Sequence, residues 1–312
     1  MKIVAVAVAG ASMGPQPLSA QEVRLFSIGS GDIAGNYFSV ARAICDAFND
    51  HDETRRRCSP EPTAGSIYNL RMLASGELGF ALVQSDWQTA AYEGMAPFSG
   101  AEPMRDLRTA MWLYPESVTI IGAPGSGIRV AADLAGKTVD IGRPASGRNA
   151  TFRSLIARLD ISEDFFGELR ELEPSAAIEE LCTGQIDATV FVVGHPSKLV
   201  SDALNKCDAV ISDFAGPRIK EVLASSSDFQ RSVIDLGLYG FPGERVETVS
   251  VMATLVTLES MDQSLVSDLV GAIRTDVDRL KVKTPVLGTL DLYLDTPSAT
   301  VVPMHPGAVS GN

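Results

Sequence analysis

The sequence predicts an α/β protein with two lobes, each a mostly parallel β-sheet flanked by helices, joined by two crossover strands. Three observations predict this fold. Short apolar strands alternate with amphipathic helices, the same order occurs twice along the chain, and two long apolar segments can connect the two occurrences. The 312 residues suffice for two compact units of ordinary domain size.

The first half of the chain contains two strand–helix units. Residues 23–28 form an apolar run that ends in glycine and serine, and apolar residues recur at helical spacing over residues 40–48. Residues 67–74 predict a second helix, which a glycine ends, and residues 80–83 predict a buried strand. Strands that alternate with helices in this way pair in parallel, with the helices on the faces of the sheet.

The second half repeats this order roughly one hundred residues later. Residues 139–141 predict a strand that leads into a glycine-rich loop, and residues 152–159 carry the apolar face of a helix. Residues 189–193 predict another buried strand. The repetition indicates a second lobe that is built like the first.

Two apolar, strand-like segments are able to cross between the lobes, at residues 109–121 and 247–258. Apolar residues at helical spacing over residues 266–280 then predict one long helix that returns to the first lobe. Two crossings allow a hinge between the lobes. We expect lobe 1 to comprise residues 21–115 and 248–312, and lobe 2 residues 116–247.

The composition argues against two classes of partner. The chain has 39 acidic and 26 basic residues and a formal net charge of −13, so it lacks a broad attraction for the phosphates of nucleic acid. After the N-terminus, no run approaches the roughly 20 apolar residues that cross a bilayer. We therefore expect a soluble mature chain that binds no nucleic acid, and we expect it to be a monomer.

The N-terminus is typical of a secretory signal peptide. Lys2 precedes an apolar run over residues 3–13, and the small pair Ser19 and Ala20 follows. We expect residues 1–20 to be a signal peptide that is cleaved after Ala20, so that the mature chain is exported. A buried first strand is the alternative interpretation of the same residues.

The cysteines are consistent with export. Cys45, Cys58, Cys182 and Cys207 show no C-x-x-C spacing and lie near no paired histidines, which argues against a metal site. An even number of cysteines in an exported chain indicates disulfides. Proximity in the sequence favours Cys45 with Cys58 and Cys182 with Cys207, and four buried thiols are the alternative.

Five loops follow a predicted strand and lead into a helix, and such loops line the ligand crevice of open α/β sheets. They are residues 30–35, 63–66, 84–86, 146–149 and 194–196. Helix N-termini present unpaired N–H groups that suit a carboxylate or phosphate. Loops of this kind in both lobes favour a binding cleft over five ordinary helix caps.

Charged and aromatic residues in these loops are candidate ligand contacts, and each has a structural alternative. Arg148 suits a carboxylate or points to solvent, and Tyr37 contacts ligand or caps the first helix. His195 donates to an anionic ligand or is a structural histidine, and Asp86 binds an ammonium group or caps a helix. Arg55–Arg57 is more typical of a solvated turn than of an anion site.

Few residues are suited to catalysis. The expected mature chain, residues 21–312, has 3 histidines and no G-x-S-x-G motif. Residues 29–34 match the dinucleotide motif G-x-G-x-x-A, but no acidic residue ends a second strand at the required distance. We predict that the protein is not an enzyme and has no cofactor, and an exported α/β enzyme is the alternative.

The chain resembles the TAXI family, the extracytoplasmic solute receptors of tripartite ATP-independent periplasmic (TRAP) transporters. The similarity spans nearly all of the mature chain and rests on the order and spacing of several motifs. These are Ser27-Ile28-Gly29-Ser30-Gly31 with Tyr37, Thr63-Ala64-Gly65-Ser66-Ile67-Tyr68-Asn69-Leu70, Gly76-Glu77-Leu78, Val83-Gln84-Ser85-Asp86 with Tyr92-Glu93-Gly94, Asp133-Leu134-Ala135-Gly136-Lys137, Gly142 to Gly147, Gly184-Gln185-Ile186-Asp187, Gly194-His195-Pro196 and His305-Pro306-Gly307-Ala308.

This resemblance implies a hinged, type II-like periplasmic-binding-protein fold, a periplasmic location, and delivery of solute to the membrane subunits of a TRAP transporter. Family ligands include glutamate, glutamine and related dicarboxylates, which implies a small organic acid or amino acid in the interlobe cleft. The positions that match are Thr63, Ser66, Gln84, Ser146 and His195, followed by Ser30, Tyr37 and Arg148. Arg148 and Asn149 stand where many members carry threonine, which leaves the solute open. A protein of the same fold that senses a ligand and signals to a partner is the alternative.

Overall fold

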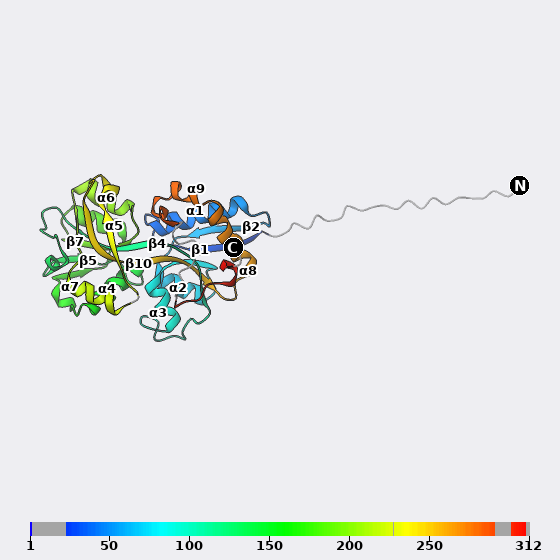
Figure 1. Cartoon of the computed structure of the whole chain (residues 1–312), viewed down its shortest axis with the longest axis horizontal. Helices are drawn as coiled ribbons and strands as arrows, with labels where there is room; N and C mark the ends of the chain where they lie inside the picture. Colours follow the sequence, from blue (N-terminus) through cyan, green and yellow to red (C-terminus); the bar gives the residue numbers. More distant parts are fainter. Residues whose placement is uncertain (2–22, 227, 291–300, 310–312) are drawn as a thin grey trace.

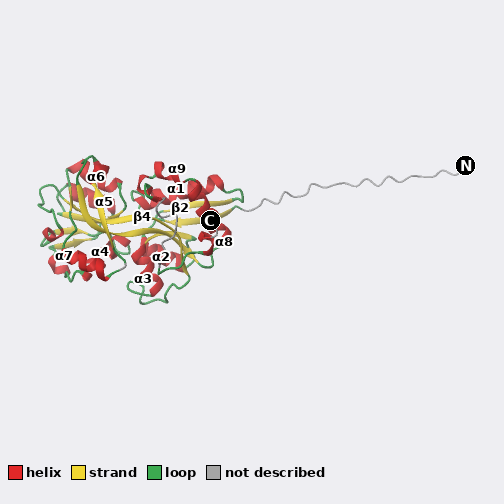
Figure 2. Cartoon of the chain, viewed as in Figure 1, coloured by secondary structure: helices red, strands yellow, loops and turns green. Residues whose placement is uncertain are grey.

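The computed structural model describes residue 1 and residues 23–226, 228–290 and 301–309. The strands of this part of the chain form one ten-stranded sheet with helices on both faces (Figure 2). The predicted α/β fold class is confirmed. The predicted signal peptide, apart from Met1, lies outside the described residues.

The first half of the sheet consists of parallel strands in the order β2-β1-β3. Strands and helices alternate as predicted, and each helix buries its apolar side against the sheet. The elements are β1 (Arg24–Gly29), α1 (Asn36–His51), β2 (Arg56–Glu61), α2 (Ser66–Ala74), β3 (Phe80–Gln84) and α3 (Ser85–Glu93).

The second half has the parallel order β7-β5-β6. Its elements are η1 (Ala131–Leu134), β5 (Thr138–Asp140), α4 (Gly147–Arg158), η2 (Glu163–Phe165), β6 (Glu168–Arg170), α5 (Pro174–Cys182), β7 (Ala188–Val193), α6 (Lys198–Cys207), β8 (Val210–Ser212), α7 (Pro217–Ser225), β9 (Gln230–Asp235) and η3 (Leu236–Tyr239).

Two long antiparallel strands connect the halves, β4 (Leu107–Gly122) and β10 (Arg245–Leu258) (Figure 1). β10 pairs with β3 in the first half and with β9 in the second, and β4 pairs with β7 and β8. The sheet is therefore continuous instead of divided between the lobes, because the crossing strands hydrogen-bond to both halves. The lobe boundaries expected above stay a prediction.

The chain ends on the first half with α8 (Gln263–Thr275), α9 (Val277–Lys283), η4 (Pro285–Leu287) and α10 (Pro306–Val309). The prediction of one long helix over residues 266–280 was wrong, because the chain leaves the helical conformation at Asp276. The Asp276 carboxylate accepts from His51, 3.1 Å away, and also contacts Arg279. Both α8 and α9 contact α1.

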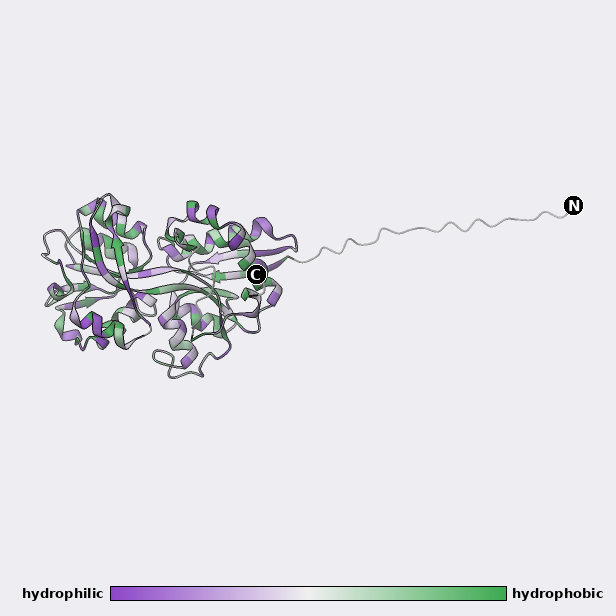
Figure 3. Ribbon diagram, viewed as in Figure 1, coloured by the Kyte–Doolittle hydropathy of each residue, from purple (hydrophilic) through white to green (hydrophobic). Residues whose placement is uncertain are grey.

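Each half has an apolar core on both faces of the sheet, and the core explains the layers. In Figure 1, α1, α5, α6 and α9 cover one face, whereas α2, α3, α4 and α7 cover the other. Hydrophobic residues concentrate on the central strands, and the outer helices alternate hydrophobic and hydrophilic residues (Figure 3). None of the described helices is long and apolar enough to cross a bilayer.

Residues Arg55–Arg57 were predicted to form a solvated turn. This prediction was wrong for Arg56 and Arg57, because these two residues begin strand β2. The Arg56 side chain is only 12% exposed, and its guanidinium forms ion pairs with Asp52 at 2.7 Å and with Asp268 at 2.5 Å. Pairing with β1 and these two carboxylates place the segment at the sheet edge.

Both predicted disulfides are present, and each lies within one half. Cys45 on α1 is joined to Cys58 on the edge strand β2, and Cys182 at the end of α5 is joined to Cys207 at the end of α6. Each bridge closes a short loop, which stabilises a fold by about 3 kcal/mol through the entropy of the unfolded chain.

Candidate functional site

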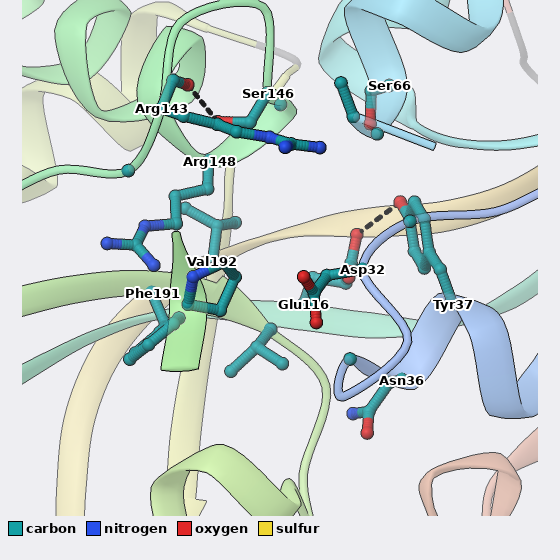
Figure 4. Close-up of a pocket in the computed structure, with 18 of the residues that line it drawn as sticks. Asp32, Asn36, Tyr37, Ser66, Glu116, Arg143, Ser146, Arg148, Phe191 and Val192 are labelled. Atoms are coloured by element: carbon teal, nitrogen blue, oxygen red, sulfur yellow. Dashed lines mark hydrogen bonds between the residues drawn. The ribbon is translucent and has the colours of Figure 1, made fainter. Parts of the chain in front are cut away.

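A pocket that is partly open to solvent lies between the two halves (Figure 4). The first half contributes the loop after β1, the start of α2 and the end of β3, whereas the second half contributes the loop after β5, the start of α4 and the end of β7. These are strand ends and helix starts, as the sequence predicted.

Five of the eight predicted contact residues line this pocket, and three do not. The lining residues come from both halves and therefore meet only in the folded chain. They are Tyr37, Ser66 and Gln84 from the first half, and Ser146 and Arg148 from the second. Ser30, Thr63 and His195 lie outside the lining.

Ser30 and Thr63 support the loop after β1. The Ser30 hydroxyl donates to the backbone carbonyl of Glu61 at 2.6 Å. The Ser30 carbonyl accepts from the Thr63 hydroxyl at 3.0 Å and from the Asn69 amide at 2.8 Å. Both hydroxyl protons are thus used within the fold.

His195 lies behind the pocket, between β4 and η3. Its Nδ1 is 2.5 Å from the Tyr239 hydroxyl, and its Nε2 is 3.0 Å from the Thr119 hydroxyl. Burial lowers the pKa of His195 to about 4, so the ring is neutral at physiological pH. With both ring nitrogens occupied, the structural alternative fits His195 better than ligand contact does.

The two lining serines shape the pocket wall. The Ser146 side chain caps α4 by accepting from the Asn149 N–H at 3.2 Å, and it donates to the Arg143 carbonyl at 2.7 Å. The Ser66 oxygen accepts from the backbone N–H of Gln84 at 3.1 Å. These bonds fix the two helix starts that face each other across the pocket.

Arg148 is buried, at 9% exposure, so the predicted alternative that it points to solvent was wrong. Its Nη2 donates to the Asp140 carboxylate and, at 3.2 Å, to the Thr189 hydroxyl. The guanidinium carbon lies 4.2 Å from the centre of the Phe191 ring. Among the described residues, Nε and Nη1 have no hydrogen-bond partner.

The surroundings of Arg148 hold it in place. Asp140 is fully buried and also accepts from the backbone N–H of Gly142 at 3.1 Å and of Leu172 at 2.9 Å. Gly142 has φ +84°, and a Cβ added there would lie 2.4 Å from Nε of Arg148. The glycine therefore leaves the space through which the arginine side chain passes.

Glu116 also lines the pocket, and the sequence analysis missed it. It lies on the crossing strand β4, is 4% exposed, and accepts from the Tyr37 hydroxyl at 2.7 Å. Burial raises the pKa of Glu116 to about 8 and also raises the pKa of Tyr37. A single acidic residue inside an otherwise apolar crossing segment was the signal that the sequence offered.

Arg143 is the second residue that the sequence analysis missed. Its side chain extends over the pocket, as Figure 4 shows, and its Nη2 donates to the Thr63 carbonyl of the first half at 3.2 Å. Arg143 also forms an ion pair with Glu173. Within the part of the chain that the structure describes, no group of three or more histidine, cysteine or acidic side chains is placed to hold a metal ion.

Residues 28–310 match the NMT1-like family. The chain belongs to this family.

Solved structures with a similar fold to this NMT1-like chain include proteins that bind small molecules. MatC from Rhodopseudomonas palustris with bound malate has a TM-score of 0.57 at 15% identity, covering 85% of this chain and 89% of that one. The periplasmic aliphatic sulphonate binding protein SsuA from Escherichia coli has a TM-score of 0.52 at 13% identity, covering 86% and 79%. The effector binding domain of QuiR in complex with shikimate has a TM-score of 0.52 at 10% identity, covering 82% and 99%.

The pocket of this NMT1-like protein therefore combines opposite chemistries. Its wall from the second half presents a buried arginine, two donors of which have no partner among the described residues. The facing wall presents the Tyr37 phenol of the first half, bonded to the buried Glu116 carboxyl of the crossing strand β4. Such walls are suited to hold the two ends of a small polar molecule. Ligand groups that reach both walls contact both halves of the protein.

Proposed function

We propose that the protein is a periplasmic solute receptor of a TRAP transporter. It binds a small anionic or zwitterionic organic solute between its two lobes and delivers it to the membrane subunits. The motifs shared with the TAXI family support this role, and membership of the NMT1-like family and the binding-protein fold are consistent with it.

The observation that carries the proposal is that buried polar groups from both halves line one pocket. Among the described residues, two nitrogens of Arg148 in the second half have no hydrogen-bond partner, and Tyr37 of the first half lines the same pocket and donates to Glu116 on the crossing strand β4. A solute that bonds to both walls binds the closed form better than the open form, and this difference in affinity drives closure. A solute that touches one wall leaves the open–closed equilibrium unchanged.

The arginine wall suits a carboxylate, because a guanidinium forms strong charge-assisted hydrogen bonds with it. Glu116 suits either kind of second group. In its protonated form it donates to a second carboxylate, and in its ionised form it accepts from an ammonium group. We propose a glutamate-like amino acid or a dicarboxylate as the solute.

Calorimetric titration with L-glutamate, L-glutamine, L-malate and succinate tests this proposal. We expect saturable binding of at least one of them by the wild type and none by the Arg148→Met variant. Repeating the titration in buffers of different ionisation enthalpy separates the solute classes, because an ammonium group displaces the proton of Glu116, whereas a dicarboxylate does not. The absence of heat with all four compounds contradicts the proposed ligand class.

A second candidate is a binding protein that senses its ligand and signals to a partner. Fold similarity to the effector binding domain of QuiR favours it. Neighbouring genes distinguish the two candidates, because genes for polytopic membrane subunits favour transport. Deletion of those genes abolishes solute uptake only if the protein serves transport.

We propose that the protein is not an enzyme. All four cysteines are in disulfides, and His195 is held by Tyr239 and Thr119 outside the pocket lining. The described lining therefore provides neither a thiol nor an imidazole for nucleophilic catalysis. Recovery of the solute unchanged after prolonged incubation is the expected result, and turnover contradicts it.

A further inference from the structure

Beside the pocket, the starts of α3 and α4 meet across the boundary between the halves. Asp86 and Trp87 lie on α3 in the first half, and Gly147 and Thr151 lie on α4 in the second. Asp86 and Trp87 are at most 8% exposed, and Thr151 is fully buried. We call this contact between the two helices the α3–α4 seam.

A directed chain of hydrogen bonds crosses the seam. Nε1 of Trp87 donates to the Thr151 hydroxyl oxygen at 2.8 Å, with a longer contact of 3.3 Å to the carbonyl of Gly147. An indole N–H only donates, so the threonine oxygen accepts there, and its single proton is left for a third group. That group is Oδ2 of Asp86, 2.6 Å away.

The Thr151 hydroxyl also lies 3.5 Å from Oε1 of Gln84 on the first half, a longer contact than the one to Asp86. Oδ1 of Asp86 accepts from the backbone N–H of Trp87 at 3.0 Å. Burial raises the pKa of Asp86 to about 7, and in either protonation state the carboxyl group keeps an oxygen that accepts from Thr151. Both bonds of the Thr151 hydroxyl therefore join the two halves.

The seam is packed without space to spare. A Cβ added to Gly147 would lie 1.8 Å from Oε1 of Gln84 and 2.6 Å from the hydroxyl oxygen of Ser66, both on the other half. Asp86, Trp87 and Thr151 are not among the residues that line the pocket. These three side chains thus join the two halves beside the pocket, whereas Gly147 of the seam also lines it.

We propose that Thr151 is a positioning residue that holds the two halves closed before a solute arrives. Removal of its hydroxyl leaves a buried carboxyl oxygen of Asp86 without its partner and leaves the Trp87 indole N–H only the longer contact to the Gly147 carbonyl. This favours the open form, where water satisfies both groups. Because the closed form is already populated, closure costs little free energy when a solute binds. The affinity of the pocket for the solute is therefore higher than in a protein that is mostly open. This last consequence rests on the proposed binding function, whereas closure itself does not.

Closure is measured without a solute. The chain has 2 tryptophans, so a Trp112→Phe background leaves Trp87 as the only one. In this background we compare Thr151, Thr151→Val and Thr151→Ser by acrylamide quenching of tryptophan fluorescence and by small-angle X-ray scattering. Valine keeps the size of threonine without the hydroxyl, and serine keeps the hydroxyl.

We expect the parent and Thr151→Ser to be compact, with Trp87 protected from acrylamide. Thr151→Val is expected to shift the open–closed equilibrium by about tenfold toward the open form, with stronger quenching and a larger radius of gyration. Equal quenching in all three proteins, or an equal shift in both variants, overturns the proposal. An exposed Trp87 in the parent also overturns it.

Trp87→Phe provides a second route if Thr151→Val does not fold. It removes the indole N–H and keeps an aromatic ring at the seam. Scattering is then the readout, and we expect the same expansion as for Thr151→Val. With L-glutamate as probe, we expect the affinity to fall in both variants, by less than the tenfold shift of the equilibrium because the parent is mostly closed, and to stay unchanged in Thr151→Ser. A wild type that is compact but binds no L-glutamate counts against that solute and not against the seam.

Discussion

The two walls of the pocket handle a buried charge in different ways. On the wall of the second half, Arg148 keeps its charge because the buried carboxylate of Asp140 lies against it. On the opposite wall, Glu116 has no cation among the described residues, only the Tyr37 hydroxyl, and burial raises its pKa to about 8. The pocket therefore has one permanently charged wall and one whose charge depends on a proton.

The largest effect on solute binding is expected from Gly147→Val, because the new side chain pushes the two walls of the pocket apart. The valine side chain occupies the position of Gln84 and Ser66 on the other half and has ordinary helical geometry on its own half. We expect solute binding to fall below detection by calorimetry while cooperative unfolding is retained.

A matched control for this variant is Gly271→Val on α8. An added Cβ at Gly271 meets no atom within 4 Å. We expect Gly271→Val to bind solute like the wild type. Normal binding by Gly147→Val contradicts the conclusion that the walls close over the solute.

Arg148→Met tests the charged wall. It removes the cation that compensates Asp140, and an uncompensated buried carboxylate costs about 3 kcal/mol of unfolding free energy. Urea unfolding measures this loss. We expect the double variant Arg148→Met, Asp140→Asn to recover part of the stability but no solute binding. If the single and double variants are equally stable, the ion pair does not hold the wall.

Glu116→Gln tests the wall that depends on a proton. Folding raises the pKa of Glu116 from 4.5 to about 8, so the folded protein retains a proton that the unfolded chain loses. The stabilisation is complete below pH 4.5 and is lost as pH rises toward 8, by about 1 kcal/mol per pH unit. Glutamine does not titrate. The unfolding free energy of the variant therefore lacks the part of the pH dependence that comes from Glu116.

Urea unfolding of both proteins from about pH 5 to about pH 7 measures the difference. We expect the unfolding free energy of Glu116→Gln, relative to the wild type, to rise by about 1 kcal/mol per pH unit. A difference that is constant with pH shows that Glu116 is ionised throughout, and the contrast between the walls then disappears.

The smallest effect on binding is expected from His195→Phe, outside the pocket. This variant removes the contacts with Tyr239 and Thr119 and lowers the unfolding free energy by about 2 kcal/mol. Because His195 is not among the lining residues, we expect the dissociation constant of the solute to stay the same. If the His195→Phe variant is folded and its affinity for the solute is clearly lower, His195 is a ligand contact after all.

Local patterns were enough to predict much of the fold. Alternating strands and helices, two crossing segments and the proximity of cysteines are properties of short stretches, and the structure bears them out. The break at Asp276 was missed because side chains from α1 and α9 stabilise it, and these meet only after folding. The strand at Arg56 and Arg57 likewise depends on β1 and Asp268.

The site was predicted in outline and missed in detail for the same reason. The sequence identifies strand ends and helix starts, and these form the pocket. The sequence does not show which hydroxyl groups donate to backbone carbonyls within the fold. The hydroxyls of Ser30 and Thr63 do so. Glu116 and Thr151 act through partners about 80 and 65 residues away in the sequence, which no local pattern encodes.

Native mass spectrometry of the protein, purified from its own cells without unfolding, tests the central claim most directly. The wild type and Gly147→Val are compared under identical conditions. We predict that the wild type carries one small organic acid or amino acid as a mass increment and that Gly147→Val carries none. A wild type without a bound molecule, or the same molecule on both proteins, contradicts a solute held between the two halves.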